Sequence, residues 1–154
     1  MKKLEIVTKI IIFSYTELSE KEKKLIDMAK HAAKDAYAPY SQFKVGSAVL
    51  LENGEIITGN NQENIAYPSG MCAERVALYH ANATFPDVKV EAIAVAAYFE
   101  GDYTEKISPC GSCRQVLQEV ENRYKSPVRV LLYGKNEVYI IESARDLIPL
   151  SFSF

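Results

Sequence analysis

Apolar residues recur at helical spacing in one early segment of the chain, directly after a capping signal. Ser19 is followed three positions later by Glu22, which is the capping-box pattern that opens many helices. The apolar positions that follow lie three or four residues apart and are Leu25, Met28, Ala29, Ala32, Ala33 and Ala36. This period predicts a helix over residues 19–37, ended by Pro39.

Short apolar runs bounded by turn residues predict strands in the rest of the chain. Residues 45–51 and 55–59 flank the dipeptide Asn53-Gly54, which is typical of a tight hairpin turn. The nearly continuous apolar run at 90–99 is typical of a strand that is buried on both faces. Two later runs, at 128–133 and 138–141, bring the predicted strands to five.

Two further helices are predicted, over residues 72–82 and 110–124, and each begins directly after a polar loop. The order is therefore a helix, two strands, and then alternating helix and strand. This order predicts a three-layer α/β/α sandwich with a mixed five-stranded sheet, in which the hairpin is antiparallel and the helix-linked strands are parallel. Since no linker or repeat interrupts the pattern, we expect a single domain over residues 1–154.

Residues 1–17 form an extension ahead of the first predicted helix. Lys2 and Lys3 precede an apolar stretch, as in a signal peptide, but Glu5 and Lys9 interrupt that stretch and no small-residue cleavage site follows. We therefore expect the extension to remain in the mature protein and to form an extra edge strand. Because its apolar run would otherwise be exposed, we expect it to dock on the sheet or on a neighbouring subunit.

Composition and charge narrow the classes of partner. The chain is 48% hydrophobic and 25% charged, which is ordinary for a globular protein, and its net charge is -2. Nucleic-acid binding needs clustered Lys and Arg, so we expect no nucleic-acid partner, no membrane partner and a small substrate. The three cysteines are too few and odd in number for a disulfide framework, so we expect reduced thiols and a cytoplasmic location.

The three cysteines share one kind of position. Cys72, Cys110 and Cys113 all lie at the beginnings of predicted helices, where free backbone amides and the helix dipole favour the thiolate. Three protein ligands leave the fourth tetrahedral position of a zinc ion open for water, as in catalytic zinc sites. Glu74 lies two residues beyond the first cysteine and is placed to carry a proton from that water.

Other interpretations of the same residues stay open on spacing alone. An isolated cysteine is usually a small buried hydrophobe, and Glu74 could be an ordinary acidic residue in a first helical turn. Cys110-Gly-Ser-Cys113 between an apolar strand and a helix is also typical of a thioredoxin-like redox site, although that leaves Cys72-Ala-Glu74 unexplained. A four-ligand structural zinc site lacks a fourth ligand, because neither His31 nor His80 has ligand-like spacing.

Together, Cys72-Ala-Glu74 and Pro109-Cys110-Gly-Ser-Cys113 resemble the zinc signature of the cytidine deaminases in its three-cysteine form. The resemblance continues through residues 38–46 and 61–64 and covers the chain from about residue 18 to the C-terminus. It implies one Zn²⁺ per subunit and hydrolysis of free cytidine and deoxycytidine to uridine and deoxyuridine plus ammonia, in pyrimidine salvage. Hydroxide attacks C4 of cytosine, and Glu74 protonates N3 and then the leaving amine.

The same resemblance implies roles for further residues. Asn61 and Glu63 would hold the ribose hydroxyls, Phe43 would pack against the nucleoside, and the backbone amide of Ala73 would bind the pyrimidine carbonyl. Arg75 and Arg114 each follow a motif residue and would offset the thiolate charge by hydrogen bonds to the sulfurs.

The C-terminal segment 147–152 resembles the family segment whose aromatic residue reaches into the active site of an adjacent subunit. This implies a homotetramer in which Phe152 covers a neighbour's pyrimidine. A tail that ends in Phe152 and Phe154 is too apolar to stay in water, so the alternative is that both rings pack on their own subunit.

Two rival deaminase functions share the zinc chemistry. A deaminase of a nucleoside antibiotic such as blasticidin would not need the pair Asn61 and Glu63 for a ribose. A polynucleotide-editing deaminase would be expected to carry basic or aromatic strand-binding surfaces, which the charge balance does not support.

Overall fold

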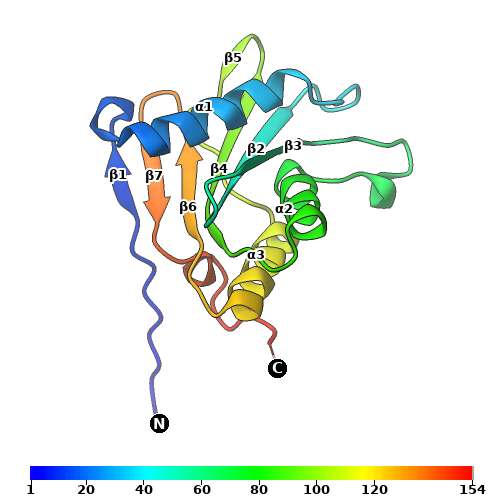
Figure 1. Cartoon of the computed structure of the whole chain (residues 1–154). Helices are drawn as coiled ribbons and strands as arrows, with labels where there is room; N and C mark the ends of the chain where they lie inside the picture. Colours follow the sequence, from blue (N-terminus) through cyan, green and yellow to red (C-terminus); the bar gives the residue numbers. More distant parts are fainter. Residues whose placement is uncertain (154) are drawn as a thin grey trace.

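The computed structural model describes residues 1–153, so the predicted burial of Phe154 lies outside the described residues. Within that part, three α-helices pack on a mixed sheet of seven strands (Figure 1). The helices are α1 (Glu20–Lys34), α2 (Ala73–Thr84) and α3 (Gly111–Tyr124). The strands are β1 (Ile11–Phe13), β2 (Lys44–Leu51), β3 (Ile56–Asn60), β4 (Val90–Phe99), β5 (Asp102–Tyr103), β6 (Arg129–Tyr133) and β7 (Val138–Ile141). Short 3-10 turns lie at η1 (Tyr15–Glu17), η2 (Tyr67–Ser69) and η3 (Ala144–Leu147).

The predicted three-layer architecture is confirmed, with the strand order β1-β7-β6-β4-β2-β3. Strand β2 is antiparallel to both β3 and β4, so β3 and β4, which α2 connects, run in the same direction. Strands β4 and β6, which α3 connects, are parallel neighbours. Helix α1 covers one face of the sheet, and α2 and α3 cover the other.

The sheet has seven strands instead of the predicted five because β1 and β5 join it. Strand β5 forms a small hairpin with the end of β4, in which Tyr98 lies opposite Tyr103. The two turn residues, Glu100 and Gly101, both have positive φ, as a tight type I′ turn requires. Two residues are too short a run to show the alternation that reveals a strand in a sequence, so only the polar loop ahead of the helix at 110–124 is predicted there.

Alternate side chains of the central strands feed two separate cores. In β2, Ala48 and Leu50 belong to the core under α1, whereas Val49 and Leu51 belong to the core under α2 and α3. The helices approach the sheet closely at glycines. A Cβ on Gly59 would lie 2.5 Å from the backbone nitrogen of Ala77, so only glycine lets α2 rest against β3 at this depth. This contact fixes where the first turn of α2 lies.

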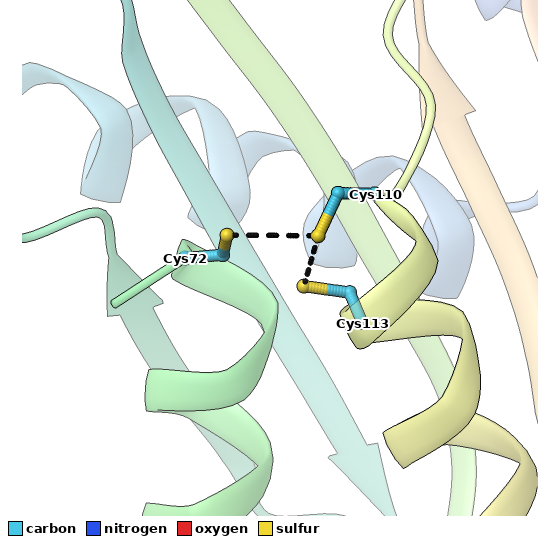
Figure 2. A group of neighbouring side chains, drawn as sticks. All are labelled: Cys72, Cys110 and Cys113. Atoms are coloured by element: carbon cyan, nitrogen blue, oxygen red, sulfur yellow. Dashed lines mark hydrogen bonds between the residues drawn. The ribbon is translucent and has the colours of Figure 1, made fainter. Parts of the chain in front are cut away.

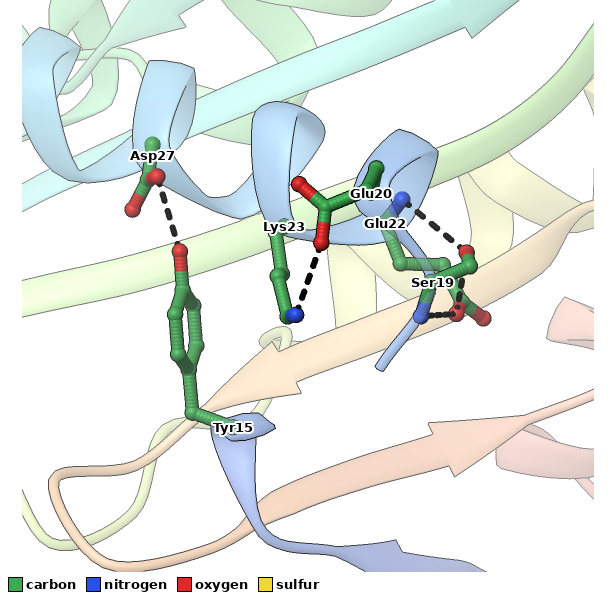
Figure 3. Close-up of polar contacts among 6 residues, drawn as sticks. All are labelled: Tyr15, Ser19, Glu20, Glu22, Lys23 and Asp27. Atoms are coloured by element: carbon green, nitrogen blue, oxygen red, sulfur yellow. Dashed lines mark hydrogen bonds and ion pairs between the residues drawn. The ribbon is translucent and has the colours of Figure 1, made fainter. Parts of the chain in front are cut away.

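The predicted capping box at the start of α1 is confirmed (Figure 3). The Glu22 carboxylate accepts hydrogen bonds from the Ser19 backbone nitrogen at 2.9 Å and from its hydroxyl at 2.6 Å. The helix ends at Lys34 and not at Tyr37. Tyr37 instead exchanges backbone hydrogen bonds with the segment after β3, donating to Asn61 at 3.1 Å and accepting from Glu63 at 2.8 Å. Tertiary contacts therefore end the helix one turn early.

The N-terminal extension contributes β1, which pairs antiparallel with β7 at one edge of the sheet. Ile11 lies opposite Ile140 and Phe13 opposite Val138. The Tyr15 hydroxyl then donates a hydrogen bond of 2.7 Å to Asp27 on α1, which ties the extension to that helix (Figure 3). Among residues 1–153, no helix is both long enough and apolar enough to span a membrane.

Candidate metal centre

The three cysteine sulfurs converge where the first turns of α2 and α3 meet (Figure 2). Cys72 is the N-cap of α2, Cys110 is the N-cap of α3, and Cys113 lies in the first turn of α3. The Sγ atoms of Cys72 and Cys110 are 3.8 Å apart, and those of Cys110 and Cys113 are 3.5 Å apart. A tetrahedral zinc ion at ~2.3 Å from each sulfur places sulfurs about 3.8 Å apart, so the donor set fits zinc.

Electrostatics favour the thiolate at Cys72 and the thiol at Cys113. Hydrogen bonding from Cys113, with a contribution from the Arg75 guanidinium, lowers the pKa of Cys72 to about 5. An Arg75 amino nitrogen lies 3.6 Å from the Cys72 sulfur. The hydrogen bond to Cys72, together with burial, raises the pKa of Cys113. Within this pair, negative charge is therefore favoured on Cys72, whose sulfur Arg75 contacts.

Glu74 lies in the first turn of α2 and its residue is only 4% exposed. An acidic residue that merely favours a helix start would project into water, whereas this side chain is enclosed. Burial raises the pKa of the Glu74 carboxyl, and the Cys72 charge raises it further. The group next to the sulfurs is therefore a carboxyl that holds its proton more readily than a carboxyl in water.

Asn61 and Glu63 lie in the loop that follows β3, and both hydrogen-bond to residues at or just before the start of β2. The Asn61 side chain accepts from the Val45 backbone nitrogen at 2.7 Å and donates to the Phe43 carbonyl at 2.9 Å. The Glu63 carboxylate accepts from the backbone nitrogens of Tyr40 at 2.9 Å and Ser41 at 3.2 Å, and from the Ser41 hydroxyl. The hydrogen bond from that hydroxyl lowers the pKa of Glu63.

A cavity of about 460 Å³ joins this loop to the metal cluster. Its lining includes Asn61, Glu63, Cys72 and Arg75, together with Tyr40, Ser41, Gln62, Asn64, Tyr67, Gly70 and Met71. This volume is in the range that binds small molecules. A larger hollow of about 800 Å³ between α1 and β3 contains none of the cysteines, so the smaller cavity is the candidate site.

Phe43 is not among the residues that line this cavity. Its ring centroid lies 5.7 Å from that of Phe99, near the end of β4. Ala73, in contrast, is the first residue of α2 directly after Cys72 and is fully buried. Its backbone N–H group lies in the first turn of the helix, where such groups have no hydrogen-bond acceptor within the helix.

Arg75 and Arg114 differ in what they contact, although the resemblance implies the same role for both. Arg75 reaches the Cys72 sulfur, as described above. The Arg114 guanidinium instead donates three hydrogen bonds of 2.8 Å, to the Pro109 carbonyl, the Leu147 carbonyl and the Ser108 hydroxyl. Three of the five guanidinium N–H groups of Arg114 are therefore directed to these acceptors and not to the sulfurs. The Arg114 side chain thereby ties the loop before Cys110 to the C-terminal segment.

The C-terminal tail runs past the first turns of α3. The Gln115 side chain donates a hydrogen bond of 2.9 Å to the Phe152 carbonyl. Phe152 itself is 70% exposed, so its ring is not buried on its own chain. The tail backbone is therefore attached close to the metal-bearing helix while the aromatic residue remains at the surface.

Ser41, Tyr40 and Met71 line the cavity, but the sequence pointed to none of them individually. Ser41 and Tyr40 lie within the segment 38–46 that carries part of the family resemblance, which was the available signal. Met71 had no distinctive signal, because only the backbone hydrogen bonds it exchanges with Gln62, both 2.9 Å, bring it to the cavity wall.

Comparisons with known proteins agree with this geometry. The family model described as the cytidine and deoxycytidylate deaminase zinc-binding region matches residues 19–126. A cytidine deaminase of Sporosarcina psychrophila is 47% identical over 100 residues, which cover 64% of this chain and 69% of that protein. One from Mycobacterium tuberculosis is 38% identical over 129 residues, which cover 80% of this chain and 84% of that protein.

The crystal structure of cytidine deaminase from Burkholderia pseudomallei superposes with a TM-score of 0.71 at 41% identity, covering 84% of this chain and 97% of that one. The matched region contains both helix starts, all three cysteines and the buried glutamate between them. The chain therefore belongs to the cytidine and deoxycytidylate deaminase family of zinc-dependent hydrolytic enzymes.

Proposed function

We propose that this protein hydrolyses the exocyclic amine of free cytidine and deoxycytidine, which gives uridine and deoxyuridine plus ammonia in pyrimidine salvage. One observation carries the proposal. Three cysteine sulfurs with zinc-compatible spacing lie beside the buried carboxyl of Glu74, and Cys72 also lines a cavity of nucleoside size. The relatives described above are named cytidine deaminases, which supports this substrate class.

Cys72, Cys110 and Cys113 would hold one Zn²⁺ per chain and leave one coordination position open. When bound, the metal supplies Lewis-acid activation of water near neutral pH. Glu74 would take one proton from that water and deliver it to N3 of the pyrimidine. It would then take the second proton from the hydroxyl group on C4 and deliver it to the departing amine, which leaves as ammonia. Because its side chain is buried beside the sulfurs, Glu74 can transfer these protons without exchange into bulk water.

Asn61 and Glu63 each retain unused hydrogen-bonding sites that a ribose could occupy. A carboxylate has roughly four acceptor sites, and the Ser41 hydroxyl and two backbone nitrogens use three of them at Glu63. Asn61 uses one lone pair and one amide hydrogen within the chain, so another of each remains. Both residues line the cavity, and their unused sites would meet the sugar hydroxyls.

Two further contacts would place the base. The backbone amide of Ala73 would donate to the pyrimidine carbonyl, since it lies at the start of α2 next to a ligand. Phe43 would have to turn from Phe99 toward the cavity to pack against the nucleoside, and the 5.7 Å pair with Phe99 is therefore the contact that substrate would replace.

Three thiolates around Zn²⁺ give the centre a net negative charge, which weakens the metal as a Lewis acid. Arg75 would offset that charge through its contact with the Cys72 sulfur. Arg114 would act less directly, by holding the Pro109 carbonyl and hence the loop that carries Cys110.

We further propose a cytoplasmic homotetramer in which Phe152 of one subunit covers the pyrimidine bound by its neighbour. The exposed ring on a tail whose backbone is held by Gln115 supports this arrangement. Nucleic acid and membranes are not expected partners, given the net charge of -2.

The decisive experiment incubates purified protein with cytidine and with deoxycytidine, measures uridine, deoxyuridine and ammonia, and assays zinc in the same preparation. Stoichiometric ammonia and one zinc per chain are expected. Blasticidin and a single-stranded oligonucleotide that contains cytosine serve as the competing substrates. Faster turnover of either competitor, or disulfide reduction by zinc-free protein without any deamination, would contradict the proposal.

A further inference from the structure

Residues 4–12, here called the N-terminal arm, expose an unusual number of large aliphatic side chains. The exposed residues are Leu4 at 78%, Ile6 at 53%, Val7 at 75%, Ile10 at 49%, Ile11 at 43% and Ile12 at 55%. The arm precedes the region 19–126 that matches the family model. A contiguous apolar segment of this kind marks an interaction surface.

The end of the arm is already an edge of the sheet. Its last residues form part of β1, which pairs with β7 on one side and is the terminal strand of the sheet. The remainder continues from β1 as extended chain (Figure 1). The Thr8 hydroxyl donates a hydrogen bond of 2.7 Å to the Asp146 carbonyl, which holds the arm alongside its own chain. The outer backbone groups of β1 have no strand beside them within the described residues, and such an edge accepts another strand.

Charge selects which strand fits this edge. In extended chain, alternate residues lie on the same side, so Glu5, Val7 and Lys9 share one side and Leu4, Ile6 and Ile10 share the other. If a second arm pairs antiparallel with Val7 opposite Val7, Glu5 lies opposite Lys9 twice and Leu4 lies opposite Ile10 twice. A parallel pair in register would place Glu5 on Glu5 and Lys9 on Lys9, which is unfavourable.

We propose that the N-terminal arm is a self-association site, which pairs antiparallel with the same arm of a second copy about a two-fold axis at Val7. In this register β1 of each copy lies opposite residues 1–3 of the other, so each sheet gains the other copy's arm beside β1, and the exposed aliphatic side chains of Leu4 and Ile10 cover one another. This contact is independent of the C-terminal tail and of the deaminase activity.

The charge arrangement gives a specific test by sedimentation velocity over a dilution series of the zinc-loaded full chain. Glu5→Lys and Lys9→Glu each place like charges opposite one another twice, so each should raise the dissociation concentration of the arm contact roughly tenfold. The double exchange Glu5→Lys with Lys9→Glu should restore the original value. Glu52→Lys, which breaks the exposed ion pair with Lys89, is the matched control and should change nothing.

Zero-length coupling of amines to carboxylates tests the register directly. Four residues of extended chain separate Glu5 from Lys9 by about 13 Å, so an amide between them must join two copies. Coupling of mixed isotope-labelled and unlabelled protein, followed by mass spectrometry, should yield labelled-to-unlabelled Glu5–Lys9 peptides. The ion pair of Lys3 with Glu5 within one chain, 3.0 Å long, is the internal positive control for reactivity.

Deamination of cytidine is measured on every sample, so a failure of the proposed function is recorded separately from a failure of the arm contact. The proposal is overturned if the double exchange stays as dissociated as the single variants, or if Lys3–Glu5 couples while Glu5–Lys9 between copies does not. It is also overturned if the arm instead binds vesicles of phosphatidylcholine and phosphatidylserine and the copies do not associate.

Discussion

The metal side and the loop side of the candidate site are built differently. On the metal side, Cys72, Glu74, Cys110 and Cys113 come from two helix starts that rest on the sheet, and their positions follow from close packing such as that at Gly59. On the loop side, Asn61 and Glu63 are held by hydrogen bonds to the segment 40–45, which leads into β2. The side chains of the metal side thus all come from one chain and are positioned by packing. On the loop side, the same polar groups hold the fold together and, as proposed, also bind the substrate.

The largest effect is expected from a metal ligand. Cys110→Ala should lose zinc and with it all measurable turnover. Two thiolates bind the ion poorly, and without the ion nothing links the first turns of α2 and α3 at the sulfurs. Zinc content by atomic absorption and the ammonia assay check this. Ser112→Ala, an exposed neighbour in the same turn, should retain its zinc. Full zinc occupancy in Cys110→Ala would place the metal elsewhere.

Next in size is the proton carrier. Glu74→Gln keeps the shape of the side chain but cannot carry the proton, so kcat should fall by about 10²–10⁴ while zinc stays at one per chain. Steady-state kinetics with zinc analysis distinguishes this from metal loss. Glu119→Gln, an exposed position on α3, is the matched control. Near-normal turnover in Glu74→Gln would remove Glu74 from the mechanism.

The two roles of Glu63, support of the loop and binding of the ribose, can be separated by comparing Glu63→Gln with Ser41→Ala. Both weaken the hydrogen bonds that hold Glu63 to the segment before β2, so both should lower the melting temperature. Only Glu63→Gln removes the charge proposed to face the ribose, so it should also raise KM about tenfold. Equal KM values in the two variants would show that Glu63 only supports the loop.

The smallest effect is expected from the tail. Phe152→Ala should raise KM about two- to tenfold with zinc unchanged, as expected for the loss of one aromatic contact. If the ring acts on a neighbouring subunit, mixing this variant with inactive Glu74→Gln chains should restore the low KM at the Phe152→Ala sites. Full activity from a monomer, or no rescue in confirmed mixed oligomers, would show that the loop side needs no partner.

Local patterns predicted most of the elements, because the signals that define them lie within a few residues. The Ser19 capping box, the hairpin at Asn53-Gly54 and the apolar run of β4 all appear where the sequence places them. The end of α1 differs, since backbone hydrogen bonds from the Asn61 segment compete for Tyr37. A partner that lies 24 positions away along the chain leaves no local signal.

The sequence by itself determined the donor atoms: three cysteines at helix starts and a glutamate two residues after the first, which is why the zinc chemistry and the family could be predicted. Only the tertiary structure decided which arginine contacts a sulfur. Arg75 and Arg114 stand in equivalent places beside motif residues, yet one points to Cys72 and the other to the carbonyls of Pro109 and Leu147. Side-chain direction depends on acceptors that the fold brings from distant segments, and no spacing along the chain encodes them.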